Sequence, residues 1–153
     1  MHSRIFQIST EPISKDKWIT EMDFYEDNSF LGAIADYVDD DTNREEDIQW
    51  LLSGFENMPV EYDEEESSII FLEGFKETYF KERFKQFKKA VNNMTFEDFL
   101  DSYEVHKIES LLKDRFGFYV HEDNWTMPLD EFVRRLLIEG QKYYFGSTID
   151  YHF

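Results

Sequence analysis

The residues with the clearest capacity for chemistry are carboxylates, and one run of them has the spacing of a calcium loop. The alternating oxygen ligands that begin an EF-hand are present at Asp39, Asp41, Asn43 and Glu45. That loop also needs glycine at its sixth position and glutamate at its twelfth, where this chain has Arg44 and Trp50. The pattern therefore argues against a calcium site, and we predict no metal ligand.

Histidine is the other residue type here that supports metal binding or acid–base chemistry, and the chain has four: His2, His106, His121 and His152. No two are four residues apart and HExxH is absent, which argues against a zinc site on one helix. A cluster of His121, His152 and Asp150 would form if their strands were neighbours, an alternative that the sequence leaves open. Without cysteine, the chain has no thiolate ligand, disulfide or cysteine nucleophile.

Carboxylate catalysis and phosphate binding have weaker signals. With 34 Asp and Glu residues, paired carboxylates occur by chance, so a small carboxylate-dependent enzyme is the third hypothesis. The six glycines are too dispersed for a GxGxxG or P-loop motif. We therefore predict a non-enzymatic protein with no catalytic residue and no cofactor.

The acids are unevenly placed along the chain. Residues 1–66 carry a net charge of −15, residues 67–94 carry +3 and residues 95–153 carry −6, within a formal total of −18. Such a field repels nucleic acid and anionic membranes and attracts basic protein surfaces. Two clusters ahead of Ile69 form the predicted partner-binding site: Asp36, Asp39, Asp40, Asp41, Glu45, Glu46 and Asp47, then Glu61, Asp63, Glu64, Glu65 and Glu66.

Length and composition indicate that these clusters sit on a folded protein. The 153 residues are 41% hydrophobic and 18% aromatic, enough for a single domain over 1–153 with its own core. There is no apolar stretch of 18 residues and no secretory leader, so we expect a cytoplasmic protein without membrane association.

Hydrophobic periodicity predicts the elements that position the acids. The predicted strands cover 4–8, 69–72, 116–120 and 143–153, with a bulge or turn at Gly146, and the predicted helices cover 29–38, 43–55, 75–93, 96–103 and 128–137, with a break near 104–106. Residues 22–28 are read as a loop, and residues 57–67 as a linker too charged to pack. This order of elements indicates an α+β fold: a small mixed or antiparallel sheet of about four strands packed against several amphipathic helices.

The strand over 69–72 and the helix after Gly74 are expected to form the middle of the core. One face of that helix carries Tyr79, Phe80, Phe84, Phe87 and Val91, and the opposite face carries Lys81, Lys85, Lys88 and Lys89. These lysines could neutralise nearby acids.

The leading hypothesis is an acidic protein that docks on a basic protein surface, with Trp50 or Tyr62 as aromatic anchors. In being small, cysteine-free, acidic and aromatic-rich, the chain resembles DNA-mimic inhibitors such as the antirestriction and anti-CRISPR proteins of phages and mobile elements. That resemblance implies a nucleic-acid-binding protein as partner, with no direct contact to nucleic acid. The alternative is an accessory or assembly protein with an apolar interface on the last strand, at Tyr143, Tyr144, Tyr151 and Phe153, whose acids serve solubility.

Overall fold

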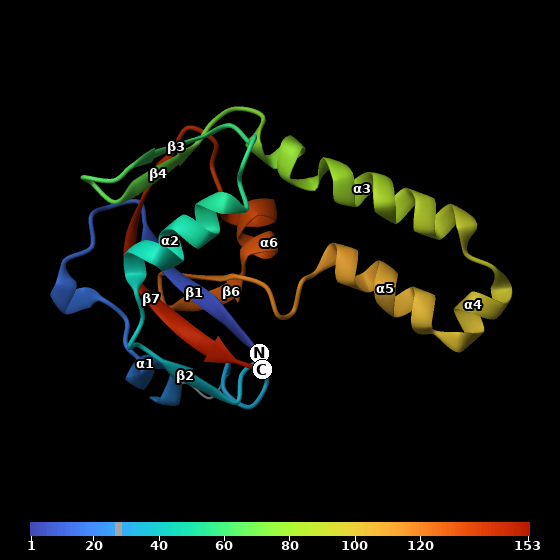
Figure 1. Ribbon diagram of the computed structural model, residues 1–153, viewed down its shortest axis with the longest axis horizontal. Helices are drawn as coiled ribbons and strands as arrows, with labels where there is room; N and C mark the ends of the chain where they lie inside the picture. The colour runs from blue at the N-terminus through green and yellow to red at the C-terminus, as the bar shows by residue number, and fades with distance from the viewer. Residues whose placement is uncertain (27–28) are drawn as a thin grey trace.

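The computed structural model describes residues 1–26 and 29–153 and shows an α+β fold built on one mixed sheet (Figure 1). The strands are β1 (His2–Ser9), β2 (Tyr37–Asp39), β3 (Val60–Asp63), β4 (Ser68–Phe71), β5 (Tyr119–Glu122), β6 (Trp125–Pro128) and β7 (Lys142–His152). The helices are α1 (Glu21–Glu26), α2 (Arg44–Ser53), α3 (Phe75–Asn93), α4 (Phe96–Asp101), α5 (Tyr103–Leu112) and α6 (Leu129–Glu131), with a 3₁₀ turn η1 (Lys15–Lys17) and a π-helical turn η2 (Phe132–Leu136) after α6. None of the helices in the described part of the chain is long and apolar enough to cross a bilayer.

Strand β7 lies at the centre of this sheet. The sheet has seven strands in the order β3-β4-β7-β1-β5-β6, and β2 also pairs with β7. Only β1 and β5 run parallel among the described pairs. The register between β1 and β7 shifts between Phe6 and Ile8. A side chain on Gly146 would meet the Gln7 amide oxygen at 2.2 Å, so the bulge predicted at this glycine is confirmed.

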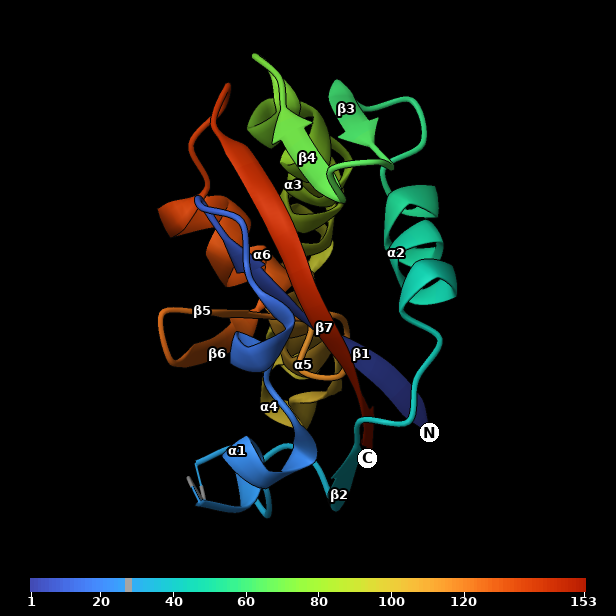
Figure 2. The ribbon, with the colours of Figure 1, turned by 90° about the vertical axis from the view of Figure 1, so that its left-hand side faces the viewer.

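Hydrophobic residues fill both faces of the sheet. On β1, Ile5 belongs to one core cluster and Phe6 and Ile8 to the other, as the alternation of a strand requires. Helix α2 and the first residue of α3, together with α6 and η2, cover one face, and α1 with the segment before β2 covers the other (Figure 2). Burial on both faces explains why β1 and β7 carry so many apolar residues in succession.

Several predictions about the elements are wrong, and most fail for the same reason. Residues 29–38 form a turn and β2 instead of a helix, because Phe30 and Val38 are buried against the sheet and Gly32 has a φ of 80°. Residues 57–67 are not a linker: Val60 and Tyr62 pack on the core while the acids between them face solvent. Tertiary burial decided these segments, and it raised the strand number from the predicted four to seven.

Residues 21–28 and 102–128 give further corrections. The predicted loop over 22–28 overlaps helix α1, although Asp27 and Asn28 lie outside the described residues. The break expected near 104–106 lies at Ser102, whose φ is 64°. The strand predicted over 116–120 corresponds to β5, which begins at Tyr119. Strand β6 was not predicted.

The helix after Gly74 does not lie in the middle of the core. Only Phe75 of α3 is buried, and α3, α4 and α5 form a helical hairpin that extends away from the sheet, which we name the arm (residues 75–112; Figure 1). Strand β4, read as central, is separated from the sheet edge only by β3. An apolar stripe indicates that one face of a helix is buried, but it does not identify the element or the partner that covers this face.

Candidate functional site

The predicted acidic residues lie on ordered elements at the side of the molecule opposite the arm (Figure 1). Eleven of the twelve are exposed: Asp36, Asp39, Asp40, Asp41, Glu45, Glu46, Glu61, Asp63, Glu64, Glu65 and Glu66. The first group runs from the residue before β2 to the first turn of α2, and the second occupies β3 and the turn to β4. We name these eleven residues the acidic surface.

Arg44 joins the two halves of the acidic surface. Its guanidinium donates to the carbonyl oxygens of Gly146 at 2.6 Å and Phe145 at 3.0 Å, both on β7. It also donates to the Ser67 hydroxyl at 2.6 Å, in the turn between β3 and β4, and lies 5.1 Å from the centre of the Trp18 ring. The start of α2 is thereby fixed beside the acidic turn, which brings the two clusters together.

Local hydrogen bonds hold several of the acids in place. The Asp39 carboxylate accepts from the backbone N–H of Asp41 at 2.8 Å, and the Asp40 carboxylate accepts from that of Glu21 at 3.1 Å. In the β3–β4 turn, Asp63 accepts from the N–H of Glu66 at 3.0 Å. The first turn of α2 adds Glu45 and Glu46, where the positive end of the helix dipole favours negative charge.

The lysines of α3 do not neutralise this surface. Among the described residues, the ion pairs of the acidic surface are Glu45 with Arg44 at 3.3 Å, Asp36 with His152 at 3.5 Å, and Glu66 with Lys142. The α3 lysine that forms an ion pair, Lys85, uses Glu82 of its own helix. The expected neutralisation is therefore not found in the described part of the chain, because the arm carries the lysines away from the acids.

A shallow depression of about 510 Å³ opens on the acidic hairpin. Its walls include Glu61, Asp63, Glu64 and Glu65, with Lys142 and the half-buried Tyr62, whose ring packs on the core. The centre of that ring lies 6.2 Å from the centre of the Phe145 ring, so it is supported from behind. The four carboxylates outnumber the one lysine, so the depression suits a lysine or arginine side chain of a partner.

Replacing Arg44 by alanine is expected to lower the free energy of unfolding by about 2 kcal/mol, because two carbonyl oxygens on β7 lose their donors. Urea denaturation monitored by circular dichroism measures this change. The matched control is Arg135→Ala. Arg135 is exposed and pairs with Glu131 one helical turn away, so this substitution should lower the free energy of unfolding by less than about 0.5 kcal/mol. Equal midpoints for the Arg44 variant and the wild type would show that Arg44 does not hold the two clusters together.

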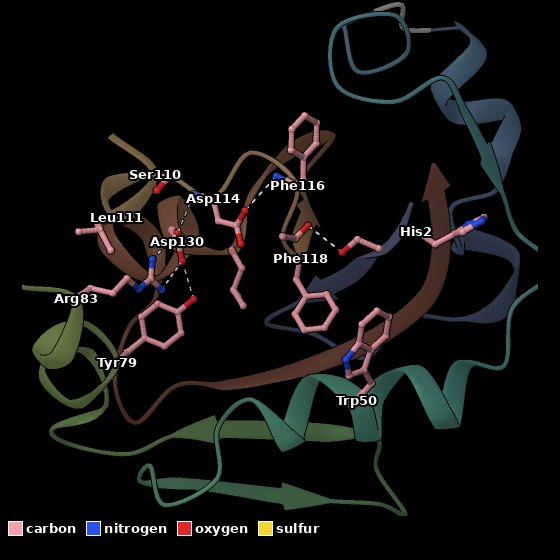
Figure 3. Close-up of a pocket in the computed structure, with 13 residues that line it drawn as sticks. His2, Trp50, Tyr79, Arg83, Ser110, Leu111, Asp114, Phe116, Phe118 and Asp130 are labelled. Atoms are coloured by element: carbon pink, nitrogen blue, oxygen red, sulfur yellow. Dashed lines mark hydrogen bonds and ion pairs between the residues drawn. The ribbon is translucent and has the colours of Figure 1, made fainter. Parts of the chain in front are cut away.

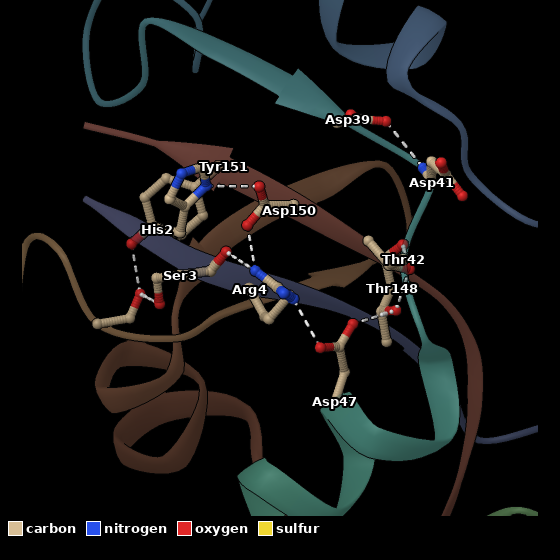
Figure 4. Close-up of polar contacts among 11 residues, drawn as sticks. His2, Ser3, Arg4, Asp39, Asp41, Thr42, Asp47, Thr148, Asp150 and Tyr151 are labelled. Atoms are coloured by element: carbon tan, nitrogen blue, oxygen red, sulfur yellow. Dashed lines mark hydrogen bonds and ion pairs between the residues drawn. The ribbon is translucent and has the colours of Figure 1, made fainter.

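Asp47, the twelfth predicted residue, is used inside the protein. It is 5% exposed, accepts from Arg4 at 2.6 Å and from the Thr148 hydroxyl at 2.8 Å, and so links α2 to the sheet (Figure 4). Arg4 also pairs with Asp150, which in turn meets His2 at 2.7 Å. The spacing contained a signal for this role, since Asp47 lies one turn before the buried Leu51 on the same face of α2.

The histidine cluster that the sequence left open does not form. His121 is opposite Gln7 on β1, and His152 is opposite His2, so the two lie roughly 17 Å apart at about 3.3 Å per strand residue. His152 meets His2 instead, with ring centres 5.0 Å apart. His121 donates to or accepts from Thr126 at 2.8 Å, and burial lowers its pKa from the ordinary value.

The carboxylates offer one group with the spacing to hold a metal ion. Oxygen atoms of Glu21, Asp39 and Asp40 lie within 4.8 Å of one another, which no other set in the described residues achieves. Two of these acids are exposed, and exposed acids cluster commonly without an ion. Asp39, Asp41, Asn43 and Glu45, which have the spacing of a calcium loop, do not share one loop, because Asn43 caps α2 and Glu45 lies in its first turn.

A cleft of about 650 Å³ between the arm and the sheet contains a partly buried ion pair, Arg83 with Asp130 (Figure 3). Asp130 on α6 is 5% exposed and accepts from Arg83 at 2.6 and 2.8 Å and from the Tyr79 hydroxyl at 2.7 Å. Burial opposes its charge, but the hydrogen bonds from Arg83 and Tyr79 outweigh burial and hold the pKa of Asp130 below its ordinary value. No pattern in the sequence indicates this cluster, because α3 and α6 are far apart along the chain.

The ion pair affects which role Asp130 can take in this cleft. Asp130 is held ionised by its partners, whereas a general acid at neutral pH needs a raised pKa. Among the described acids, Glu122 has its pKa raised, mainly by burial, and it lies at the end of β5 outside the lining of the cleft. Trp50 also lines this cleft, with its ring centre 4.8 Å from that of Phe118, so it does not belong to the acidic surface.

Comparison with known proteins gave no match. No protein-family model, no curated protein and no solved structure is similar to this chain at a significant level. The geometry of the acidic surface is therefore the basis for a functional inference.

Proposed function

We propose that this protein is a non-enzymatic binding protein whose acidic surface docks on a basic protein surface. One observation supports the proposal: eleven exposed carboxylates are held on ordered elements, are joined through Arg44, and are largely free of cationic partners among the described residues. Keeping so many like charges together costs stability, so a partner that neutralises them is a reasonable purpose.

The basic partner that fits best is a nucleic-acid-binding protein. Such proteins have clefts lined with lysine and arginine that match the charge density of DNA, about one phosphate per 1.7 Å of duplex axis. A rigid acidic surface that occupied such a cleft would exclude DNA, which is the action of a DNA-mimic inhibitor. Tyr62, expected as an aromatic anchor, packs on the core side of β3, so the proposed contact depends on the carboxylates.

Changing Asp39, Asp40 and Asp41 together to asparagine is expected to weaken binding by about tenfold or more at low salt, because each lost charge removes part of the attraction. Asparagine keeps the oxygen that accepts the N–H of Asp41 or Glu21, so the fold should persist. Binding to an immobilised basic DNA-binding domain, with pI above about 9, is measured between about 50 and 500 mM salt.

The matched control removes three exposed acids from the arm, through Glu97→Gln, Asp101→Asn and Glu109→Gln. It has the same net charge as the first variant and should bind nearly as well as the wild type. A duplex DNA competitor should displace the protein from the basic domain. Affinity that does not change with salt, or equal losses in the two triple variants, would contradict docking through the acidic surface.

The second candidate function is an accessory or assembly protein with an apolar interface. The last strand cannot supply that interface, because Tyr143 and Tyr151 are 2% and 0% exposed at the centre of the sheet. What favours this candidate is the arm, which carries several large apolar side chains in solvent.

A further inference from the structure

The arm exposes more apolar surface than a helical hairpin needs for its own packing. Ile108 on α5 is buried. In contrast, Phe84 on α3 and Phe99 on α4 are 60% and 61% exposed. The other exposed large apolar residues of the arm are Val91, Phe96, Leu100, Tyr103 and Leu112. At 150–250 Å² for an aromatic side chain, the four exposed rings alone present roughly 500 Å².

Part of this surface is organised into a groove. A depression of about 260 Å³ is lined by Phe80, Phe84 and Phe87 of α3 and by Leu111 and Leu112 of α5, together with the arginines Arg83 and Arg134, which lie over the Phe80 ring. Phe84 and Val91 are seven residues apart, so they lie on the same side of α3 and extend this apolar stripe toward the tip. The groove is therefore one continuous face shared by the two long helices of the arm.

The base of the arm is held firmly, so this face is presented in a fixed position. The Arg83–Asp130 pair ties α3 to α6. Glu139, after η2, accepts the N–H groups of Gly74 at 3.0 Å and Lys76 at 2.9 Å and so caps the start of α3. These hydrogen bonds lower the pKa of Glu139.

The charge of the arm points to what covers this face. Residues 75–112 carry seven bases and seven acids, so the arm is neutral and the rest of the chain has the whole net charge of −18. Two copies that meet body to body bring strongly acidic surfaces together, whereas two copies that meet arm to arm bring together surfaces with no net charge. The geometry assigns the apolar face of the arm to a second copy of this chain, in a twofold pair of hairpins that forms a four-helix arrangement.

The arm is long enough to keep the two acidic bodies apart in such a pair. Helix α3 has 19 residues and is about 28 Å long at 1.5 Å per residue. With the two tips pointing in opposite directions, the bodies lie at opposite ends of the bundle, several times the Debye length of about 8 Å at physiological salt. A standard stable interface needs about 800 Å² per copy, and the exposed side chains on the groove side of α3 and α5 would supply the apolar part of such a contact.

The test is the oligomeric state of the full chain by sedimentation equilibrium. The wild type should be a dimer in the micromolar range, and the variant Phe84→Ser with Leu112→Ser should have a dissociation constant raised by about 100-fold or more. Both side chains are exposed, so circular dichroism should be unchanged. The control is Trp125→Ser, an exposed apolar residue on β6, which should dimerise like the wild type.

A monomeric wild type at high micromolar concentration, or a dimer that survives the double substitution, would overturn this inference. Loss of the dimer in the Trp125 variant alone would place the interface on β6 and overturn it as well. Raising the salt concentration should leave the dimer intact or strengthen it, because salt screens the repulsion between the bodies. Binding to a basic partner should weaken with salt, so failure of one proposal leaves the other standing.

Discussion

Replacing Asp130 by alanine is expected to lower the free energy of unfolding by about 3 kcal/mol, since the substitution leaves Arg83 partly buried without its carboxylate. The Tyr79 hydroxyl and the N–H of Asp114 lose the same acceptor. Because these groups belong to the arm and its junction with the sheet, hydrogen exchange in residues 75–112 should also accelerate. Urea denaturation and exchange measured by mass spectrometry provide the two readouts.

The matched control is Asp101→Ala, an exposed aspartate at the end of α4, which should change stability by less than about 0.5 kcal/mol. Replacing both partners, through Arg83→Met with Asp130→Leu, should recover most of the loss because no unpaired charge remains. An Asp130→Ala protein as stable as the wild type would show that the arm is fixed by other contacts.

The contribution of Asp130 has a defined pH dependence. Its pKa is lower in the folded protein than the ordinary value of about 3.9, so its stabilisation is complete above that value and is lost as the pH falls through the folded pKa. The difference in stability between the wild type and Asp130→Ala should therefore be constant near neutrality and shrink below about pH 4. A difference that grew in acid would contradict the ion pair.

Removal of residues 143–153 is expected to abolish folding altogether. These residues form nearly all of β7, which joins β1 to β4 and β2. Tyr143 and Phe145 belong to one core cluster, and Ile149 and Tyr151 belong to the other, so both faces of the sheet lose their centre. Circular dichroism should show no cooperative thermal transition.

A point substitution on β7 distinguishes the effect of deleting the strand from the effect of changing its exposed surface. Tyr144→Ser changes a half-exposed residue and should retain a cooperative transition. A truncated chain that still unfolded cooperatively would show that β7 is not needed for folding. That result would support the alternative hypothesis, in which the last strand is an apolar interface.

Local signals in the sequence were the dependable ones. Thr95 starts α4 with a reciprocal capping box to Asp98, as the predicted helix start required, and the bulge at Gly146 follows from its lack of a side chain. Helix α2 begins at Arg44, one residue after its predicted start. Asn43 caps the helix, and the hydroxyl of the preceding Thr42 forms a hydrogen bond with that of Thr148 on β7. Such features depend on neighbours along the chain, which a sequence displays directly.

The remaining features depend on partners that are distant in sequence. The acidic surface is assembled by Arg44 reaching Ser67 and Gly146, and neither contact has a local signature. Burial of Asp47 depends on Arg4 of β1, and the charge pattern alone placed it with its exposed neighbours. The direction of the arm likewise could not be predicted, because a helix with an apolar stripe is compatible with a buried and with a projecting position.

The strand order has a consequence for how the chain reaches its native state. Strand β1 pairs with β7 across more than 130 residues, and β5 pairs with β1 in parallel, so most sheet contacts have very high sequence separation. Topologies of this kind fold slowly, whereas helices in a hairpin close in microseconds. The arm should therefore be structured while the sheet is still open, and a folding intermediate with a formed hairpin and unpaired β1 and β4 would be the species most prone to aggregate.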